Sequence, residues 1–265
     1  MKIALYANSS LSAAAEIASE IYSLLDGNVT LEAETAAILG RKGVPLGRIA
    51  SDVLIVVGGD GTMLKTLMRY EGPVLGVNAG DVGFLTEVGR KGIARAVRML
   101  REGRYTVEEK IKLKTVVSGR RMDDAVNEAL VTSADPGKVR HFNLSISGYP
   151  VGLVKSDGII VSTPTGSTSY SLAAGGPIVD PSASVFVISP VAPYGISSRP
   201  IVTGNGSVIE LTVEGERRCI LVIDGQVRHA LSGRETVTFS LSEKKASFVS
   251  LDHDFYRRIR TKLTG

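Results

Sequence analysis

The amino-acid sequence predicts an α/β N-terminal domain with an open parallel sheet, followed by an all-β domain and a C-terminal helix. Strand and helix signals alternate in the first part of the chain, which is the rhythm of βαβ units. After Tyr105 the apolar pattern changes to period two, with turn residues between the runs. A basic stretch with helical spacing, Asp252 to Leu263, closes the chain. We therefore expect domains at residues 1–105 and 106–248 and a helical tail at 249–265.

The first domain contains a run that is typical of a strand buried on both faces of a parallel sheet. Val53 to Val57 is apolar throughout, rich in β-branched residues, and followed by glycines. A helix is expected from Leu11 to Asp26, where apolar residues share one face and Gly27 ends the pattern. The remaining expected elements are two strands, Lys2–Ala7 and Pro73–Val77, and two helices, Thr62–Arg69 and Gly92–Glu102.

The second domain carries short alternating runs that are separated by turn signals. Ser118-Gly119-Arg120 and Ser147-Gly148-Tyr149 are typical of tight hairpin turns. The expected strands include Asn143–Ser147, Val185–Ser189, Ser207–Val213, Cys219–Ile223 and Thr236–Leu241. Short strands joined by such turns indicate an all-β domain.

Composition excludes several classes of protein. The chain has 265 residues, of which 43% are hydrophobic and 22% charged, so it is neither disordered nor a collagen-like repeat. The single cysteine, Cys219, excludes an intramolecular disulfide and a thiolate zinc site, and we expect a cytoplasmic protein. No apolar run approaches the roughly 18 residues of a membrane span, so we expect no membrane partner.

The net charge of +4, from 31 basic and 27 acidic residues, is a weak signal for nucleic acid. Most of the basic excess lies between Arg90 and Arg121, where arginines flank the apolar residues Ile93, Val97 and Leu100. A solvated helix face explains this pattern better than a binding patch, because aromatic residues that could stack on bases are scarce there. We expect no nucleic-acid partner.

A glycine turn between an expected strand and an expected helix carries the clearest chemical signal. Gly58, Gly59 and Gly61 permit close approach of the backbone to phosphate groups, and Thr62 can cap the helix that follows. Asp60 does not suit phosphate binding, because a carboxylate among phosphates is repulsive unless it holds Mg²⁺ or accepts a hydroxyl proton. Its presence favours phosphoryl transfer to an alcohol, and the alternative is an ordinary acidic residue in a tight turn.

The Gly-Gly-Asp-Gly-Thr element at 58–62 resembles one that NAD kinases, diacylglycerol kinases and phosphofructokinases share. The segment at 163–177, Thr-Pro-Thr-Gly-Ser-Thr-Ser-Tyr-Ser-Leu-Ala-Ala-Gly-Gly-Pro, resembles the long second signature of NAD kinases alone. Three further segments match that family in the same order: Asn78-Ala79-Gly80 through Gly83-Phe84-Leu85-Thr86, then Asn127-Glu128, then Asp224-Gly225-Gln226. The resemblance covers residues 53–228.

The resemblance to NAD kinases implies a fold, a reaction and a cofactor. It implies a β-sandwich for the second domain, with the site between the two domains. It implies that ATP, or polyphosphate, phosphorylates the adenosine ribose 2′-hydroxyl of NAD to give NADP, with Mg²⁺ as cofactor. Asp60 would accept the proton of that hydroxyl late, and its larger role would be to position the oxygen.

The same resemblance implies residues that bind the substrates. Gly61 and Lys65 would lie beside the nucleotide, and Asn127 with Glu128 would hold the adenosine end. The residues implied to line the dinucleotide pocket or to contact its phosphates are Lys138, Lys155, Asp157, Thr168, Ser169, Tyr170, Ser171, Leu172, Ala173 and Gln226. From the residues alone, Tyr170 could stack on a purine or lie half-buried in the core, and the two lysines could equally be exposed strand residues.

The sequence departs from the family pattern at two positions. Tyr194 follows Pro193 where family members commonly carry His, and Ala173 replaces a frequent serine. Two other functions remain open: a lipid kinase that uses the same glycine turn, and a dinucleotide sensor without catalysis. Asp60 argues against the sensor, because a pure binding site does not need a carboxylate among phosphates.

We expect a homo-oligomer, a dimer or a tetramer, as the resemblance implies. The apolar strands Val185–Ser189 and Cys219–Ile223 could bury an outward face against a second copy. Alternatively, these strands face each other within one sandwich.

Overall fold

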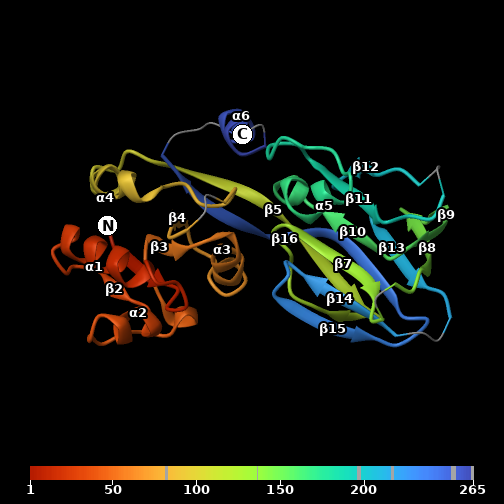
Figure 1. Ribbon diagram of the computed structural model, residues 1–265, viewed down its shortest axis with the longest axis horizontal. Coiled ribbons are helices and arrows are strands. Elements are labelled where there is room, and N and C mark those ends of the chain that lie inside the picture. The colour runs from red at the N-terminus through yellow and green to blue at the C-terminus, as the bar shows by residue number, and fades with distance from the viewer. Residues whose placement is uncertain (81–82, 136, 196–197, 216–217, 252–254, 264–265) are drawn as a thin grey trace. The chain divides into compact units, whose positions relative to one another are not determined.

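The computed structural model describes residues 1–80, 83–135, 137–195, 198–215, 218–251 and 255–263. The chain divides into two compact units (Figure 1). Unit 1 comprises Met1–Glu109 and Ala246–Gly265, and unit 2 comprises Lys110–Lys245. The closing helical segment is therefore grouped with the first unit. Within the described ranges, no helix combines the length and the apolar character that a membrane span requires.

Unit 1 contains a parallel sheet, as predicted. Its strands are β1 (Ile3–Ala7), β2 (Thr30–Leu31), β3 (Val53–Gly58) and β4 (Val74–Asn78), in the order β2-β1-β3-β4. Every residue of β3 is buried, which confirms the prediction from its apolar run. The end of β16 (Thr236–Ser250) adds a further parallel strand beside β4, where Phe248 pairs with Val74.

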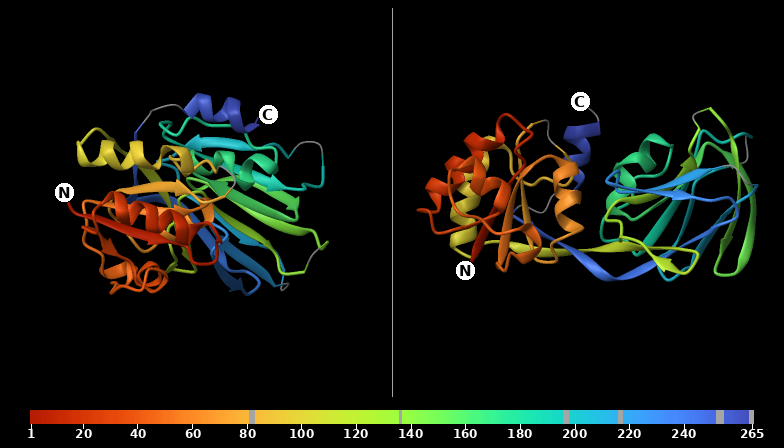
Figure 2. Two further views of the ribbon diagram at one scale, coloured as in Figure 1. Left: turned by 60° about the vertical axis from the view of Figure 1, so that its left-hand side comes forward. Right: turned by 90° about the horizontal axis from the view of Figure 1, so that it is seen from below.

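Helices cover both faces of this sheet (Figure 2). The α-helices of unit 1 are α1 (Ala14–Leu24), α2 (Ala33–Ile38), α3 (Asp60–Leu67), α4 (Ile93–Arg101) and α6 (Phe255–Leu263), and two short 3-10 helices are η1 (Leu46–Arg48) and η2 (Arg90–Gly92). Helix α4 buries Ile93, Ala96, Val97 and Leu100 and leaves its arginines in solvent, so the expected solvated basic face is confirmed.

Unit 2 is an antiparallel β-sandwich. Its strands are β5 (Thr106–Val117, which begins in unit 1), β6 (Arg120–Arg121), β7 (Glu128–Ser133), β8 (Arg140–Ile146), β9 (Tyr149–Ser156), β10 (Gly158–Ser162), β11 (Val185–Val191), β12 (Ile201–Gly204), β13 (Ile209–Val213), β14 (Cys219–Ile223) and β15 (Val227–Leu231). One sheet runs β16-β13-β8-β9, with β5 beside β16, and the other runs β12-β11-β10-β7-β14-β15. Phe142, Phe239 and Phe186 come from both sheets and are fully buried, so the core lies between the layers.

Two hairpins follow the predicted turn chemistry. Ser118 and Gly119 have φ values of 45° and 85°, and Ser147 and Gly148 have 52° and 80°. Two consecutive positive φ angles define the type I′ turn, which matches the twist of the strands that it joins. The turns connect β5 to β6 and β8 to β9.

The end of one strand was predicted wrongly. The strand expected at Thr236–Leu241 continues to Ser250 as β16, because a polar run hides the alternation of its buried residues. The strands Val185–Ser189 and Cys219–Ile223 expose little apolar surface, since residues 186–190 of β11 are all buried and Ile220 and Val222 of β14 are partly buried. Both strands lie inside the six-stranded sheet with a neighbour on each side.

A short 3-10 helix, η3 (Thr165–Thr168), and a short helix, α5 (Tyr170–Ala173), follow β10 in unit 2. They contain most of the segment in which the long signature was found. Within unit 2 they pack against each other and against β10 and β11.

Candidate active site

The glycine turn of unit 1 joins the carboxyl end of β3 to the start of α3. Gly59 is the N-cap of the helix, with an extended backbone, and Asp60 is the first helical residue. A Cβ added to Gly58 would lie 2.5 Å from the Cβ and the Oγ1 of Thr62, so this tight turn requires a glycine. Ligands of open α/β sheets bind at this edge, outside the carboxyl ends of the strands.

The Asp60 carboxylate is held by the backbone of a segment that is distant in sequence. The N–H of Phe84 donates to Oδ2 at 2.7 Å, and the N–H of Leu85 donates to Oδ1 at 3.0 Å. Two backbone amides fix both oxygens, so the carboxylate has one defined orientation. The Gly83-Phe84-Leu85-Thr86 segment, which resembles the family in sequence, is therefore the segment whose backbone holds the Asp60 carboxylate.

Thr62 does not cap α3, contrary to the prediction. No side chain caps this helix, and Thr62 lies buried within its first turn. Its Oγ1 accepts a hydrogen bond from Nδ2 of Asn8 at 2.9 Å. Of the other residues predicted in this turn, Gly61 and Lys65 are exposed.

Two asparagines extend this edge of the sheet and were missed as site residues. Asn8 follows β1, and Asn78 ends β4, where it pairs with Gly58. Asn78 Oδ1 accepts the N–H of Gly80 at 2.8 Å, whereas the buried Nδ2 has no hydrogen-bond partner among the residues that the structure describes. An unpaired buried donor is costly, so a ligand or a water is expected to accept from it. The sequence feature that could have identified both asparagines is a polar residue at the end of a buried strand or directly after it.

Glu128 is the first residue of β7, and Asn127 directly precedes it. A buried carboxylate, Asp224, organises this point of unit 2. It accepts the N–H groups of Val126, Asn127 and Glu128 at 2.7, 2.8 and 3.0 Å. Asp224 occupies the β14–β15 turn with a φ of 49°. It fixes the backbone of the predicted pair, although it was not predicted as a site residue itself.

The long signature packs against the same backbone. Thr163 donates through Oγ1 to the Val126 carbonyl at 2.6 Å, and its N–H donates to the Asn127 carbonyl at 2.9 Å. A Cβ on Gly166 would lie 2.2 Å from the Asn127 carbonyl oxygen. Two predicted binding segments, 127–128 and 163–173, are thus joined backbone to backbone.

Unpaired buried polar atoms lie where the backbone of residues 126–128 meets the long signature, a place called the junction below. Within the described part of the chain, Asn127 Oδ1, Glu128 Oε2 and Thr165 Oγ1 are buried and have no hydrogen-bond partner. Ser169 donates to Glu128 Oε1 at 3.2 Å. Burial, with the negative charge of Asp224, raises the pKa of Glu128 to about 8. Burial also raises the pKa of Asp224 to about 6, although its three backbone hydrogen bonds act in the opposite direction. The junction has hydrogen-bonding capacity that its own residues leave unused.

The remaining predicted residues differ in how accessible they are. Tyr170 is 44% exposed, so it is not a half-buried core tyrosine. Ser171 is fully buried and its hydroxyl bonds to that of Ser189 at 2.9 Å, so its side chain supports the loop. Half-buried residues are Thr168, Leu172 and Asp157, and exposed residues are Ala173, Gln226, Lys138 and Lys155. Lys138 precedes β8, whereas Lys155 lies on β9.

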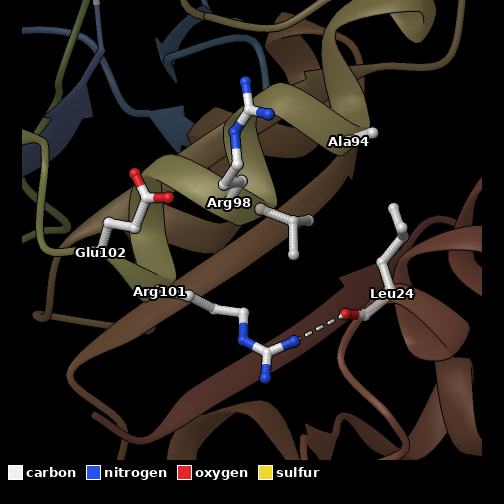
Figure 3. A pocket seen from close by; sticks show the side chains of 6 residues that line it. Leu24, Ala94, Arg98, Arg101 and Glu102 are labelled. Atoms are coloured by element: carbon white, nitrogen blue, oxygen red, sulfur yellow. Dashed lines mark hydrogen bonds between the residues drawn. The ribbon is translucent and has the colours of Figure 1, made fainter.

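A groove of about 380 Å³ lies elsewhere on unit 1, between α1 and α4 (Figure 3). It is lined by Leu24, Ala94, Val97, Arg98, Arg101 and Glu102, none of which belongs to the glycine turn. Arg101 donates to the Leu24 carbonyl at 3.3 Å and pairs with Asp26. Among the residues that the structure describes, no three His, Cys, Asp or Glu side chains are grouped as metal ligands.

Comparisons with known proteins agree with both halves of the chain. The ATP-NAD kinase N-terminal domain matches residues 43–105, and the ATP-NAD kinase C-terminal domain matches residues 126–251. NAD kinase from Thermoplasma acidophilum is 41% identical over 266 residues, which cover 99% of this chain and 98% of that protein. NAD kinase from Methanothermobacter thermautotrophicus is 38% identical over 273 residues, covering 99% and 96%.

Solved structures agree as well. An NAD kinase from Archaeoglobus fulgidus in complex with ATP superposes with a TM-score of 0.78 at 27% identity, covering 100% of this chain and 98% of that one. Yeast NADH kinase complexed with NADH has the same fold, with a TM-score of 0.89 at 19% identity, covering 100% and 87%. The predicted fold class and the resemblance are confirmed. Because both family domains match in order and relatives match over the full length, the chain belongs to the ATP-NAD kinase family and is a kinase.

Proposed function

We propose that this kinase transfers the terminal phosphoryl group of ATP to the 2′-hydroxyl of the adenosine ribose of NAD, which gives NADP. The observation that carries the proposal is the carboxylate of Asp60, which two backbone amides hold at a glycine turn. A helix N-terminus with glycines suits phosphates, and a fixed carboxylate beside them suits an acceptor hydroxyl. The Archaeoglobus relative in complex with ATP supports ATP as the donor.

The proposed reaction balances without a further reactant. The 2′-oxygen forms a bond to the γ-phosphorus, the bond from that phosphorus to the bridging oxygen breaks, and ADP leaves. The proton of the 2′-hydroxyl passes to Asp60 late in the step. Since the transition state of phosphoryl transfer is loose, the larger contribution of Asp60 is to align the oxygen.

Unit 2 supplies the groups proposed to bind NAD. The unpaired oxygens of Asn127, Glu128 and Thr165 can serve a ribose diol or an amide. The exposed ring of Tyr170 can stack on adenine, at the start of the short helix α5. Lys138 and Lys155 of unit 2 are proposed to lie near the dinucleotide phosphates, and Gly61 and Lys65 of unit 1 beside the nucleotide, which agrees with the exposure of all four residues.

Mg²⁺ is the proposed cofactor, and the residues at the turn fit it in one way. Asp60 is a single carboxylate whose oxygens keep lone pairs beside the two amide bonds. Mg²⁺ is commonly held by one or two carboxylates together with substrate phosphates and waters. These residues therefore suit a cation that arrives with the phosphates of ATP. Bound Mg²⁺ would neutralise phosphate charge.

We further propose a cytoplasmic homo-oligomer, a dimer or a tetramer. The support now comes from β9, an edge strand that exposes Tyr149, Val151 and Leu153 at 78%, 46% and 46%. Exposed apolar residues on an unpaired edge are typical of a surface that another chain covers. The buried single cysteine, Cys219, is consistent with a reducing compartment.

NADP formation tests the function. The protein is incubated with NAD, ATP and Mg²⁺, and NADP is detected by an NADP-specific dehydrogenase. NADP should accumulate in step with ADP. Parallel reactions with NADH and with polyphosphate identify the acceptor and the donor. Release of ADP without NADP, or phosphorylation of diacylglycerol in its place, would contradict the proposal.

A further inference from the structure

The C-terminal helix α6 contacts the segment that holds Asp60, and both belong to unit 1. The guanidinium of Arg258 donates through Nη1 to the Phe84 carbonyl oxygen at 3.2 Å. Through Nη2 it donates to the Glu87 carboxylate, with which it forms an ion pair. Arg258 is 30% exposed and Glu87 9%, so this ion pair is largely shielded from solvent. One arginine thus binds both ends of the segment from Phe84 to Glu87.

The peptide unit between Phe84 and Leu85 joins this arginine to the Asp60 carboxylate. Its carbonyl accepts from Arg258, and its N–H donates to Asp60 Oδ1 at 3.0 Å. A peptide unit is planar, so fixing the direction of the carbonyl also fixes the direction of the N–H. A charged donor on the carbonyl polarises the amide and strengthens the bond that its N–H makes.

Glu87 anchors the far end of the same segment. Its Oε1 accepts the N–H of Leu251 at 3.1 Å, directly after β16. Its own N–H donates to the Gly76 carbonyl of β4 at 2.9 Å. The segment is therefore held against the sheet independently of Arg258, and loss of the arginine should alter its orientation without detaching it.

We propose that Arg258 is a positioning residue for phosphoryl transfer: it holds the Phe84–Leu85 peptide, and this peptide holds the Asp60 carboxylate. Arg258 itself contacts neither the substrate nor the reacting atoms in this proposal. The inference rests on the proposed role of Asp60. It assigns to α6 a role in catalysis and not only in folding.

The structure offers a control that makes the same types of contact at a more exposed position. Arg101 also donates to a backbone carbonyl, that of Leu24 (Figure 3). It also pairs with a carboxylate, that of Asp26. Arg101→Ala therefore removes the same types of contact on unit 1, at α4 and away from the glycine turn. Asp60→Asn serves as the reference for loss of the reacting carboxylate.

The test measures kcat, the KM values for NAD and ATP, and the melting temperature for Arg258→Ala, Arg258→Lys, Arg101→Ala and Asp60→Asn. Arg258→Ala should lower kcat by roughly 10- to 100-fold, because small displacements of a reacting group cost this much. Its KM values should stay near those of the unmodified protein, whereas Arg101→Ala should leave kcat unchanged. Millimolar guanidinium chloride should restore part of the kcat of Arg258→Ala only.

Arg258→Lys should have an intermediate kcat, since an ammonium group can reach one acceptor but lacks the two-pronged geometry. If Arg258→Ala does not fold, Arg258→Lys decides, and a kcat equal to that of the unmodified protein would overturn the inference. A folded Arg258→Ala variant with unchanged kcat would also overturn the inference. The same holds if guanidinium chloride fails to restore any of the kcat that this variant has lost. Full activity of Asp60→Asn would instead contradict the proposed role of Asp60.

Discussion

Gly83 leaves no room for any side chain beside Asp60. A Cβ added to Gly83 would lie 1.8 Å from Oδ1 of Asp60 and 2.3 Å from its Cγ. The next two residues, Phe84 and Leu85, donate their N–H groups to the same carboxylate. The close approach of this backbone and the orientation of the proposed proton acceptor therefore depend on one glycine.

Gly83→Ala should lower kcat by roughly 10²-fold, because the new methyl group must displace either the Asp60 carboxylate or the backbone that binds it. NAD binding should change little, since the groups proposed to bind NAD come from unit 2. Gly89→Ala is the control, because a Cβ at Gly89 meets nothing within 4 Å and its φ of −82° suits alanine. Steady-state kinetics and calorimetric NAD titrations measure both effects. Equal kcat values for the two variants would refute the steric argument.

Tyr170→Ala should weaken NAD binding by roughly 1–3 kcal/mol, the scale for losing an aromatic stack on a base. Because Tyr170 is 44% exposed, its truncation should hardly change the melting temperature. Tyr170→Phe keeps the ring and should bind NAD nearly as well as the unmodified protein. A Kd that is the same for all three proteins would exclude stacking by Tyr170.

The raised pKa of Glu128 predicts that the stability of the protein depends on pH. Its pKa is raised to about 8 in the folded protein, from an ordinary 4.5 that the unfolded chain should keep. Between these values the folded protein binds a proton that the unfolded chain lacks, so stability falls as the pH rises through this window. Asp224, whose pKa is raised to about 6, contributes with the same sign.

Glu128→Gln removes one of these two contributions and keeps the other. Its melting temperature should therefore fall less than that of the unmodified protein between about pH 5 and pH 8. Thermal melts at matched ionic strength measure the difference. Parallel curves for the two proteins would show that Glu128 is ionised in the folded state throughout this range.

Several elements of secondary structure could be predicted because their signals are local. The apolar run of β3, the glycines after it and the type I′ hairpins all depend on neighbouring residues. The cap of α3 was predicted wrongly, because the missing Cβ of Gly58 lets Thr62 turn inward, where Asn8 donates to it.

The backbone amides that hold the carboxylates of Asp60 and Asp224 could not be predicted from local pattern. Phe84 lies 24 residues from Asp60, and Asn127 lies 97 residues from Asp224. Only the tertiary fold brings these amides to the carboxylates. The resemblance to NAD kinases identified the segments that contain Asp60, Phe84, Asn127 and Asp224, but the hydrogen bonds that join them in pairs required the structure.

Shared sites between subunits would leave a signature in mixed oligomers. Lys155 is exposed on β9, the edge strand proposed as an interface, and could reach dinucleotide phosphates of a neighbouring copy. If both single variants are inactive, mixing Asp60→Asn with Lys155→Ala should recover activity in some sites. Light scattering should give a mass well above the 28.0 kDa monomer. A fully active monomer, or no recovery despite confirmed subunit exchange, would contradict shared sites.

The single-turnover rate of NADP formation by Asp60→Asn tests the central claim most directly. Asparagine cannot accept the proton and offers one acceptor oxygen where Phe84 and Leu85 need two. With NAD, ATP and Mg²⁺ saturating, the rate should fall by about 10²- to 10⁴-fold, while NAD binding and the fold are largely kept. A rate close to that of the unmodified protein, in a variant that still binds NAD, would contradict the assignment of Asp60 as the residue that positions and deprotonates the 2′-hydroxyl.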